Sequence, residues 1–128
     1  QAYMDAVPGL EKLVTAVKSK AESGYINLCD GRRCSVDGAH KALNYLLQGS
    51  AGVLAKRWLL INHESTRELC CSQLAFVHDE IQFECDPKHV EPLRTSLVRS
   101  AEEAGRYYNL RIPIAAEAQV GDNWSEVH

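Results

Sequence analysis

Two adjacent carboxylates, Asp79 and Glu80, follow His78 between two short runs of mostly apolar residues. Residues 74–77 are apolar at every position, which predicts a strand covered on both faces. Residues 81–85 alternate apolar and polar side chains, which predicts a half-exposed neighbouring strand. We therefore expect a β-hairpin whose tight turn presents carboxylate oxygens from rigid flanks. This arrangement suits a hard cation such as Mg²⁺.

An acidic hairpin tip of this kind can serve phosphoryl transfer. In that interpretation Asp79 and Glu80 form the metal site, with Asp79 as the Mg²⁺ ligand, and His78 lies near the substrate. The alternative is a solvated turn with two ordinary surface acids, because acidic residues are common at turns. The spacing by itself favours this alternative, so other parts of the chain have to decide.

Composition predicts an ordinary globular protein. The chain has 128 residues, with 45% apolar and 24% charged residues, and we expect one soluble domain in the cytoplasm of a bacterium or a phage-infected host. No run of about 18 apolar residues occurs, so we expect no membrane span. The net charge of −3 argues against an independent nucleic-acid-binding module. The five cysteines include no C-x-x-C pair, which predicts reduced thiols and no zinc site. Because the first residue is Gln1, we expect a piece of something longer.

The elements around the hairpin predict an α+β fold, an antiparallel sheet with packed helices. In order they are a helix over 8–23, strands at 25–29 and 32–36, helices over 37–48 and 53–70, the acidic hairpin, a helix over 87–105, a strand over 111–120, and a tail. Asp30-Gly31 is the strongest hairpin signal, and Asp37 is expected to cap the second helix. The small residues 49–52 predict a break in that helix. Beyond it, Arg57 and Asn62 are expected on the solvent side.

His40, Asn44 and Gln48 recur every four residues and therefore predict a polar row along one helix face. A solvent-facing row is the commoner explanation, but this one lacks the Lys and Glu that normally cover such a face. Neutral side chains at this spacing suit the minor groove, where the acceptors carry little sequence information. An enzyme that copies arbitrary sequence needs that kind of contact.

Four motifs occur in the order and at the spacing of one protein family. They are Asp-Gly-Arg-Arg at residues 30–33, Asn44-x-x-x-Gln48-Gly49, Val-His-Asp-Glu at 77–80, and Gly-x-Asn-Trp-x-x-x-His at 121–128. The chain resembles the C-terminal palm fragment of family A DNA polymerases, the DNA polymerase I type, and the phage-like branch in particular. The resemblance implies a helix leading in from the fingers (1–24), duplex-contacting helices (37–70), the motif C hairpin (72–85), and a closing helix, strand and tail (87–128).

The resemblance also implies roles for the singled-out residues. Asp79 matches the metal-binding aspartate of motif C, Glu80 the adjacent carboxylate, and His78 a residue that contacts the primer end. Asn44 and Gln48 match positions that contact the primer–template duplex from the minor groove. His40, the third DNA-binding candidate, departs from the family, because the bacterial enzymes carry Arg there.

The implied activity is nucleotidyl transfer from dNTPs to a primer 3′-OH by two Mg²⁺ ions. Such a centre needs a second aspartate, which the family takes from upstream of residue 1, as it does the helix that binds the incoming nucleotide. We therefore expect the isolated chain to be inactive. Apolar surface left by the missing parts predicts that two copies of the fragment can pair.

Two other interpretations remain open. Metal-dependent phosphohydrolases also use a His-Asp pair, but they place it on a helix with further histidine ligands. A helix over residues 74–85 would favour them. The second is a non-catalytic interaction or structural module derived from a palm, which metal binding at Asp79 would argue against.

Overall fold

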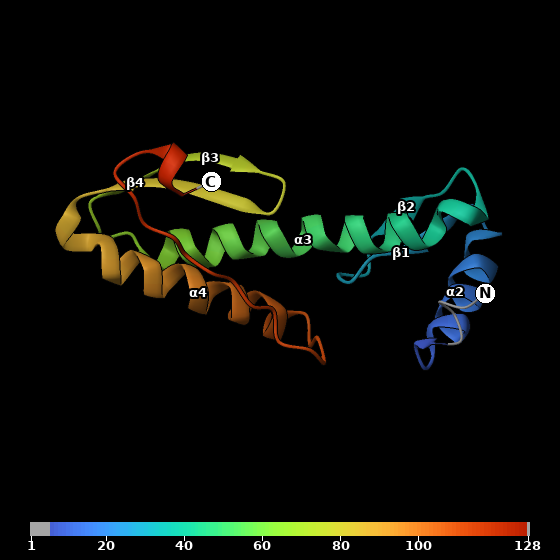
Figure 1. The fold of residues 1–128 in the computed structure, drawn as a ribbon. Helices are drawn as coiled ribbons and strands as arrows, with labels where there is room; N and C mark the ends of the chain where they lie inside the picture. Colours follow the sequence, from blue (N-terminus) through green and yellow to red (C-terminus); the bar gives the residue numbers. More distant parts are fainter. Residues whose placement is uncertain (1–5, 128) are drawn as a thin grey trace. The chain divides into compact units, whose positions relative to one another are not determined.

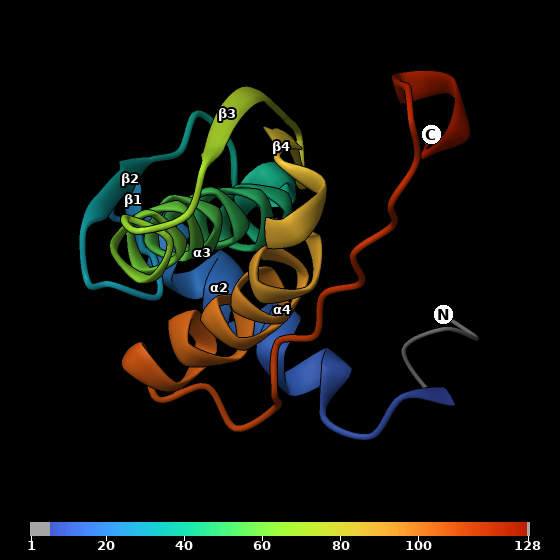
Figure 2. The same ribbon diagram turned by 90° about the vertical axis from the view of Figure 1, so that its left-hand side faces the viewer.

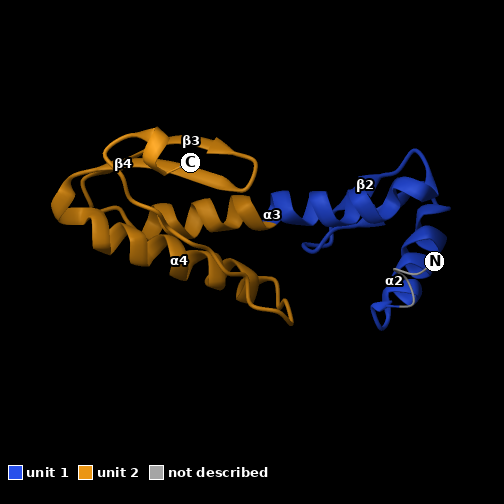
Figure 3. Cartoon of the chain, viewed as in Figure 1, with its two compact units in different colours: residues 1–53 blue, residues 54–128 orange. Residues whose placement is uncertain are grey.

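The computed structural model describes residues 6–127, so His128, the end of the fourth motif, lies outside the described residues. In chain order the elements are α2 (Leu10–Ala21), β1 (Tyr25–Asn27), β2 (Arg33–Ser35), η1 (Ala39–Lys41), α3 (Ala42–Ser65), β3 (Cys71–Val77), β4 (Glu80–Cys85), η2 (Pro87–His89), α4 (Val90–Tyr107) and η3 (Trp124–Glu126) (Figure 1). They form two compact units, residues 1–53 and 54–128, whose boundary falls inside α3 (Figure 3). No helix within residues 6–127 combines the length and the apolar character needed to cross a bilayer.

The α+β class is confirmed, but the strands are distributed differently from the prediction. The described strands make two separate two-stranded antiparallel sheets, β1–β2 and β3–β4, instead of one sheet. Each sheet is a hairpin of neighbouring strands. A hairpin alone buries little surface, so each depends on the helices of its own unit for stability.

Unit 1 is held together by a small apolar core. Val17 and Ala21 of α2 pack with Ile26 of β1 and with Ala42 at the start of α3. The predicted Asp30-Gly31 hairpin is confirmed, because β1 pairs with β2 and Gly31 takes φ 84° in the turn. Only glycine adopts this left-handed conformation without steric cost.

Helix α3 runs without interruption through the predicted break at residues 49–52, so that prediction was wrong. Gly49 serves a close approach instead, since a Cβ placed there would lie 2.8 Å from Leu28 Cδ2. The neighbouring Ser50 Oγ accepts a hydrogen bond of 3.2 Å from the Cys29 backbone N–H. The small residues thus allow the β1–β2 hairpin to lie against a continuous helix.

The predicted cap at Asp37 was also wrong. The residue that precedes the short helix η1 is Gly38, and no side chain caps it. The Asp37 carboxylate instead accepts hydrogen bonds from Lys41 Nζ at 2.7 Å and Tyr45 Oη at 3.3 Å. Asp37 therefore contacts η1 through Lys41 and the first turn of α3 through Tyr45, without capping a helix.

Unit 2 is organised around the contact between its part of α3 and α4, which lie side by side (Figures 1 and 2). Asn62 was expected on the solvent side but is buried, with 1% of its surface exposed. Its Oδ1 accepts hydrogen bonds from Ser96 Oγ at 3.0 Å and Ser100 Oγ at 3.5 Å. Trp58 Nε1 donates to the Leu97 carbonyl at 2.8 Å. These polar contacts fix α3 against α4.

Arg57 also departs from its expected solvent position. Its guanidinium lies 3.8 Å from the ring centroid of Tyr107 and 5.9 Å from that of Tyr108. Cation–π contacts of this kind hold the end of α4 against α3.

The strand predicted over residues 111–120 does not form, since the structure assigns no strand or ladder partner there. The side chains still alternate, with Ile114, Ala116 and Ala118 partly buried and their neighbours exposed. Ile114 packs on Gly105, where an added Cβ would lie 2.9 Å from Ile114 Cγ1. The segment is therefore extended and attached by side chains, and Pro113 removes one of the donors a ladder would need.

Candidate functional site

The acidic motif lies at the tip of the β3–β4 hairpin, as predicted. The last ladder pair joins Val77 to Glu80, so only His78 and Asp79 form the turn. His78 takes φ 55°, a left-handed conformation that is uncommon for a residue with a side chain. Two-residue turns need such a positive φ to match the twist of their strands. Asp79 is thereby held at a rigid, short tip, and Glu80 belongs to strand β4.

A β-bulge at Leu74 interrupts the regular alternation of faces along β3. The pairing shifts between Gln73 and Ala75, which leaves Leu74 without a partner in the ladder. The prediction of a strand covered on both faces was wrong, because Leu74 is 60% exposed and Val77 46% exposed. After the shift, Phe76 pairs with Ile81 and so lies on the apolar face of the hairpin.

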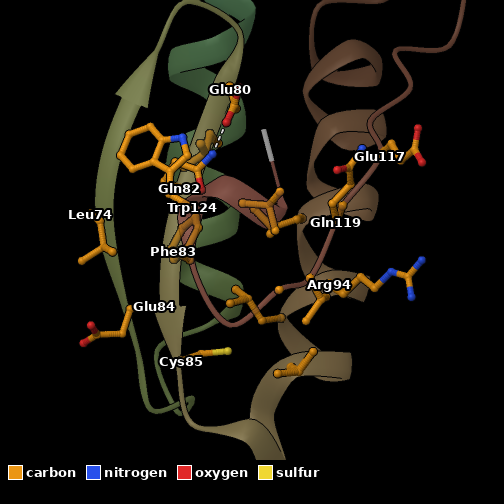
Figure 4. A pocket seen from close by; sticks show the side chains of 18 of the residues that line it. Leu74, Glu80, Gln82, Phe83, Glu84, Cys85, Arg94, Glu117, Gln119 and Trp124 are labelled. Atoms are coloured by element: carbon orange, nitrogen blue, oxygen red, sulfur yellow. Dashed lines mark hydrogen bonds between the residues drawn. The ribbon is translucent and has the colours of Figure 1, made fainter.

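The two carboxylates of the tip differ in their surroundings. Asp79 is exposed, and none of the salt bridges found within residues 6–127 involves it. Glu80 is half-buried and accepts a hydrogen bond from Gln82 Nε2 (Figure 4). Gln82 was not singled out from the sequence. The available signal was its position two residues after Glu80, which puts both side chains on one face of the strand.

An open cavity of about 810 Å³ adjoins the tip (Figure 4). It lies between β4, α4 and the C-terminal segment of residues 117–127, which includes η3. Asp79 and Glu80 are among its lining residues, together with apolar side chains such as Phe83 and Leu93. Space for a ligand therefore exists beside the carboxylates.

The donor set fits part of a hard-cation site. Carboxylate oxygens are what Mg²⁺ prefers, and Asp79 has no cation of the protein competing for it among the described residues. However, no group of three or more His, Cys, Asp or Glu side chains in residues 6–127 is arranged to hold a metal ion. The hairpin thus offers two neighbouring carboxylates, fewer than a complete set of ligands.

The polar row belongs to unit 1. His40 lies in η1, and Asn44 and Gln48 lie on α3, all three exposed. Asn44 and Gln48 share a helix face, as their four-residue spacing predicts. The ring of His40 lies close to Gly38, where an added Cβ would be 2.8 Å from His40 Cε1. Two amides and one imidazole are therefore available to a partner outside the chain.

Comparison with known proteins settles the family. The family model of DNA polymerase family A matches residues 1–126. The chain belongs to DNA polymerase family A. It is 29% identical over 130 residues to the DNA-directed DNA polymerase of Escherichia phage Phieco32, covering 94% of this chain and 21% of that protein. It is 31% identical over 116 residues to the enzyme of Enterobacteria phage T3, covering 81% of this chain and 16% of that protein.

A solved structure shows the same fold as this family A chain. The POL domain of Pol1 from M. smegmatis, in complex with DNA primer-template and dNTP, superposes with a TM-score of 0.86 at 24% identity. The match covers 98% of this chain and 24% of that one. From the coverage of the two phage enzymes above, the chain spans about a fifth of the length of its curated relatives.

The phosphohydrolase interpretation was wrong. It required a helix over residues 74–85, and the structure has the paired strands β3 and β4 there.

Proposed function

We propose that this chain is part of a template-directed DNA polymerase that transfers nucleotides from dNTPs to a primer 3′-OH by two-metal-ion catalysis. The observation that carries the proposal is the exposed Asp79 on a two-residue turn with Glu80 beside it, in a chain of DNA polymerase family A. The relatives that match it carry the name DNA-directed DNA polymerase, and the solved structure holds DNA primer-template and dNTP.

Asp79 and Glu80 are the residues we propose for holding Mg²⁺. Bound there, Mg²⁺ would neutralise the charge that develops on phosphate oxygens during nucleotidyl transfer. The rigid turn keeps Asp79 at a fixed position, and the hydrogen bond from Gln82 orients the Glu80 carboxylate. His78, the other turn residue, is proposed to contact the primer end.

His40, Asn44 and Gln48 are proposed to contact the primer–template duplex. Amide and imidazole groups can donate to the minor-groove acceptors that occur in every base pair, so binding would tolerate any sequence. The exposure of all three side chains supports the proposal, because none is engaged in the core of unit 1.

Alone, the chain is proposed to be inactive. No group of three or more His, Cys, Asp or Glu side chains among the described residues could hold a metal ion, and two-metal catalysis needs acids from more than one segment. We place the whole enzyme in the bacterial cytoplasm, where its DNA substrate is. Pairing of isolated chains stays a prediction, which the exposed apolar side chains Leu74, Val77 and Leu60 support.

The metal site can be tested on the chain itself by titrating Mn²⁺ into isotopically labelled protein and recording NMR line broadening. Broadening should centre on Asp79 and its neighbours, with an affinity on the order of millimolar because few ligands are present. Asp79→Asn, which keeps the shape of the side chain, should abolish it. Glu84→Gln removes an exposed acid farther along β4 and should leave the broadening unchanged.

A second measurement connects the metal site to synthesis. In the full-length polymerase, Asp79→Asn should abolish primer extension while Glu84→Gln leaves it intact. Retention of Mn²⁺ broadening in Asp79→Asn would show that Asp79 is not the metal ligand. Broadening without any effect on extension would favour the non-catalytic module.

A further inference from the structure

Three cysteines meet at the end of the β3–β4 hairpin opposite its acidic tip. Cys70 precedes β3, Cys71 begins it, and Cys85 ends β4. All three are free thiols, with Cys70 exposed and the other two partly buried. They lie outside the proposed metal and DNA sites, and none was assigned a role from the sequence.

The strand register sets Cys71 directly opposite Cys85. Directly opposed residues of an antiparallel pair project from the same face of the sheet, so the two thiols lie on one side. Cys70 is one residue earlier and therefore projects from the other side. The register thus distinguishes two cysteines that are neighbours in the sequence.

The hydrogen-bond pattern shows what kind of pair Cys71 and Cys85 form. The Asp86 N–H donates to the Cys70 carbonyl at 3.1 Å, so Cys70 and Asp86 occupy a hydrogen-bonded position at the end of the ladder, although the Cys70 N–H donates to His89 Nδ1. Hydrogen-bonded and non-hydrogen-bonded pairs alternate along an antiparallel ladder, so Cys71 and Cys85 form a non-hydrogen-bonded pair. Such pairs have Cα atoms about 4.5 Å apart, within the range of about 4.4–6.8 Å that disulfides require.

We propose that Cys71 and Cys85 are a redox-modification site, a cross-strand thiol pair that a low-molecular-weight disulfide converts into an intramolecular disulfide. The Cys71 thiolate attacks one sulfur of glutathione disulfide, forms a mixed disulfide and expels one glutathione thiolate. The Cys85 thiolate then attacks the Cys71 sulfur and expels the second glutathione. Two protein thiols are oxidised, one small disulfide is reduced to two thiols, and the two protons released by the cysteines protonate the leaving thiolates.

Burial supports this order of attack. Desolvation raises the pKa of the Cys85 thiol, and the neighbouring Cys71 adds to the shift. At neutral pH a smaller fraction of Cys85 is therefore thiolate than in a cysteine with an ordinary pKa. This suits Cys85 to the second, intramolecular step, because the sulfur that it attacks is held beside it. The resulting bridge would close a ring that contains the whole acidic turn.

The test uses the intact 128-residue chain incubated with glutathione disulfide, quenched with acid, and mapped by mass spectrometry. Proteolysis after Glu84 separates Cys85 from Cys70 and Cys71, so a bridge leaves two peptides joined. We expect the yield of the Cys71–Cys85 disulfide to exceed that of the Cys70–Cys85 disulfide by about tenfold or more. Only the sulfur of Cys71 lies on the same face as Cys85, where the Cys85 thiolate can attack it. In urea the two linkages should form about equally, since their loops differ by a single residue.

Matched variants complete the test. Cys70→Ser should form the bridge as the unmodified chain does, whereas Cys85→Ser should stop at a mixed disulfide on Cys71. A native chain that links Cys70 to Cys85 as readily as Cys71 would overturn the proposal. So would mixed disulfides that persist on both Cys71 and Cys85. Because the urea comparison uses the unmodified chain, the conclusion does not depend on the folding of any variant.

Discussion

Replacing Asn62 by Ala should destabilise unit 2 through a single contact between α3 and α4. Asn62 is 1% exposed, and its Oδ1 accepts the hydroxyl hydrogen bond of Ser96 at 3.0 Å. Ser100 also reaches this oxygen at 3.5 Å, but it has the Ser96 and Leu97 carbonyls as alternative acceptors. The main loss is therefore one partly buried hydrogen bond, with the Ser96 hydroxyl left without its acceptor.

The magnitude follows from that loss. One hydrogen bond contributes about 1 kcal/mol, and leaving a buried partner unsatisfied adds about 1–2 kcal/mol. Asn62→Ala should thus lower the free energy of unfolding by about 2–3 kcal/mol. Urea denaturation followed by tryptophan fluorescence reports on this unit, because Trp58 and Trp124 both belong to it. His63→Ala, at an exposed neighbouring position of α3, should change the free energy by less than about 0.5 kcal/mol.

A double-mutant cycle shows whether the contact itself is responsible. Once Asn62 is absent, Ser96→Ala should cost less than it does in the unmodified chain, with a coupling energy of about 1 kcal/mol. Equal effects of Asn62→Ala and His63→Ala would refute the reasoning. Full additivity of Asn62→Ala and Ser96→Ala would do the same.

Three further outcomes are expected. Arg57→Lys should destabilise the chain by about 1 kcal/mol in the same urea assay, because Lys stacks less well on Tyr107, whereas Lys56→Arg, on the exposed side, should have no effect. His78→Gly should stabilise the hairpin by about 1 kcal/mol, since glycine adopts φ 55° without steric cost, and a loss of stability would contradict the strained-turn interpretation. The hydrogen bond from Lys41 lowers the pKa of Asp37 below its ordinary value of 3.8. The ionised Asp37 therefore stabilises the fold fully above pH 3.8, and this stabilisation is lost as the pH falls through the lowered pKa. An NMR titration should find the Asp37 pKa closer to 3.8 in Lys41→Met.

Much of the fold could be predicted because its signals are local. Asp30-Gly31 specified one hairpin through turn chemistry, and the apolar runs around residues 78–79 specified the other. The acidic tip was found for the same reason, since the residues of a two-residue turn are neighbours in the sequence. The hydrogen bond between Gln82 and Glu80 is also local, because the two residues are two positions apart on one strand and share a face.

What could not be predicted depends on partners far away in the sequence. Asn62 has the spacing of a solvent-facing residue, and only Ser96 on α4 makes its burial favourable. Gly49 has the residue type of a helix break, and only its close approach to Leu28 explains why a glycine occurs within a continuous helix. The strand over residues 111–120 had the right alternation of side chains, but alternation does not specify a ladder partner. In each case a contact across the fold outweighed the local preference.

The bulge at Leu74 has a consequence for how the hairpin can change in length. Because Leu74 has no partner in the ladder, its deletion would join Gln73 to Ala75 in a regular strand and leave the pair Val77–Glu80 as it is. A deletion or insertion inside the turn cannot be absorbed by an unpaired residue in this way, because it would move Asp79 relative to both strands. A residue can therefore be gained or lost midway along β3 without shifting the turn, whereas a change in the number of residues between Val77 and Glu80 would move Asp79.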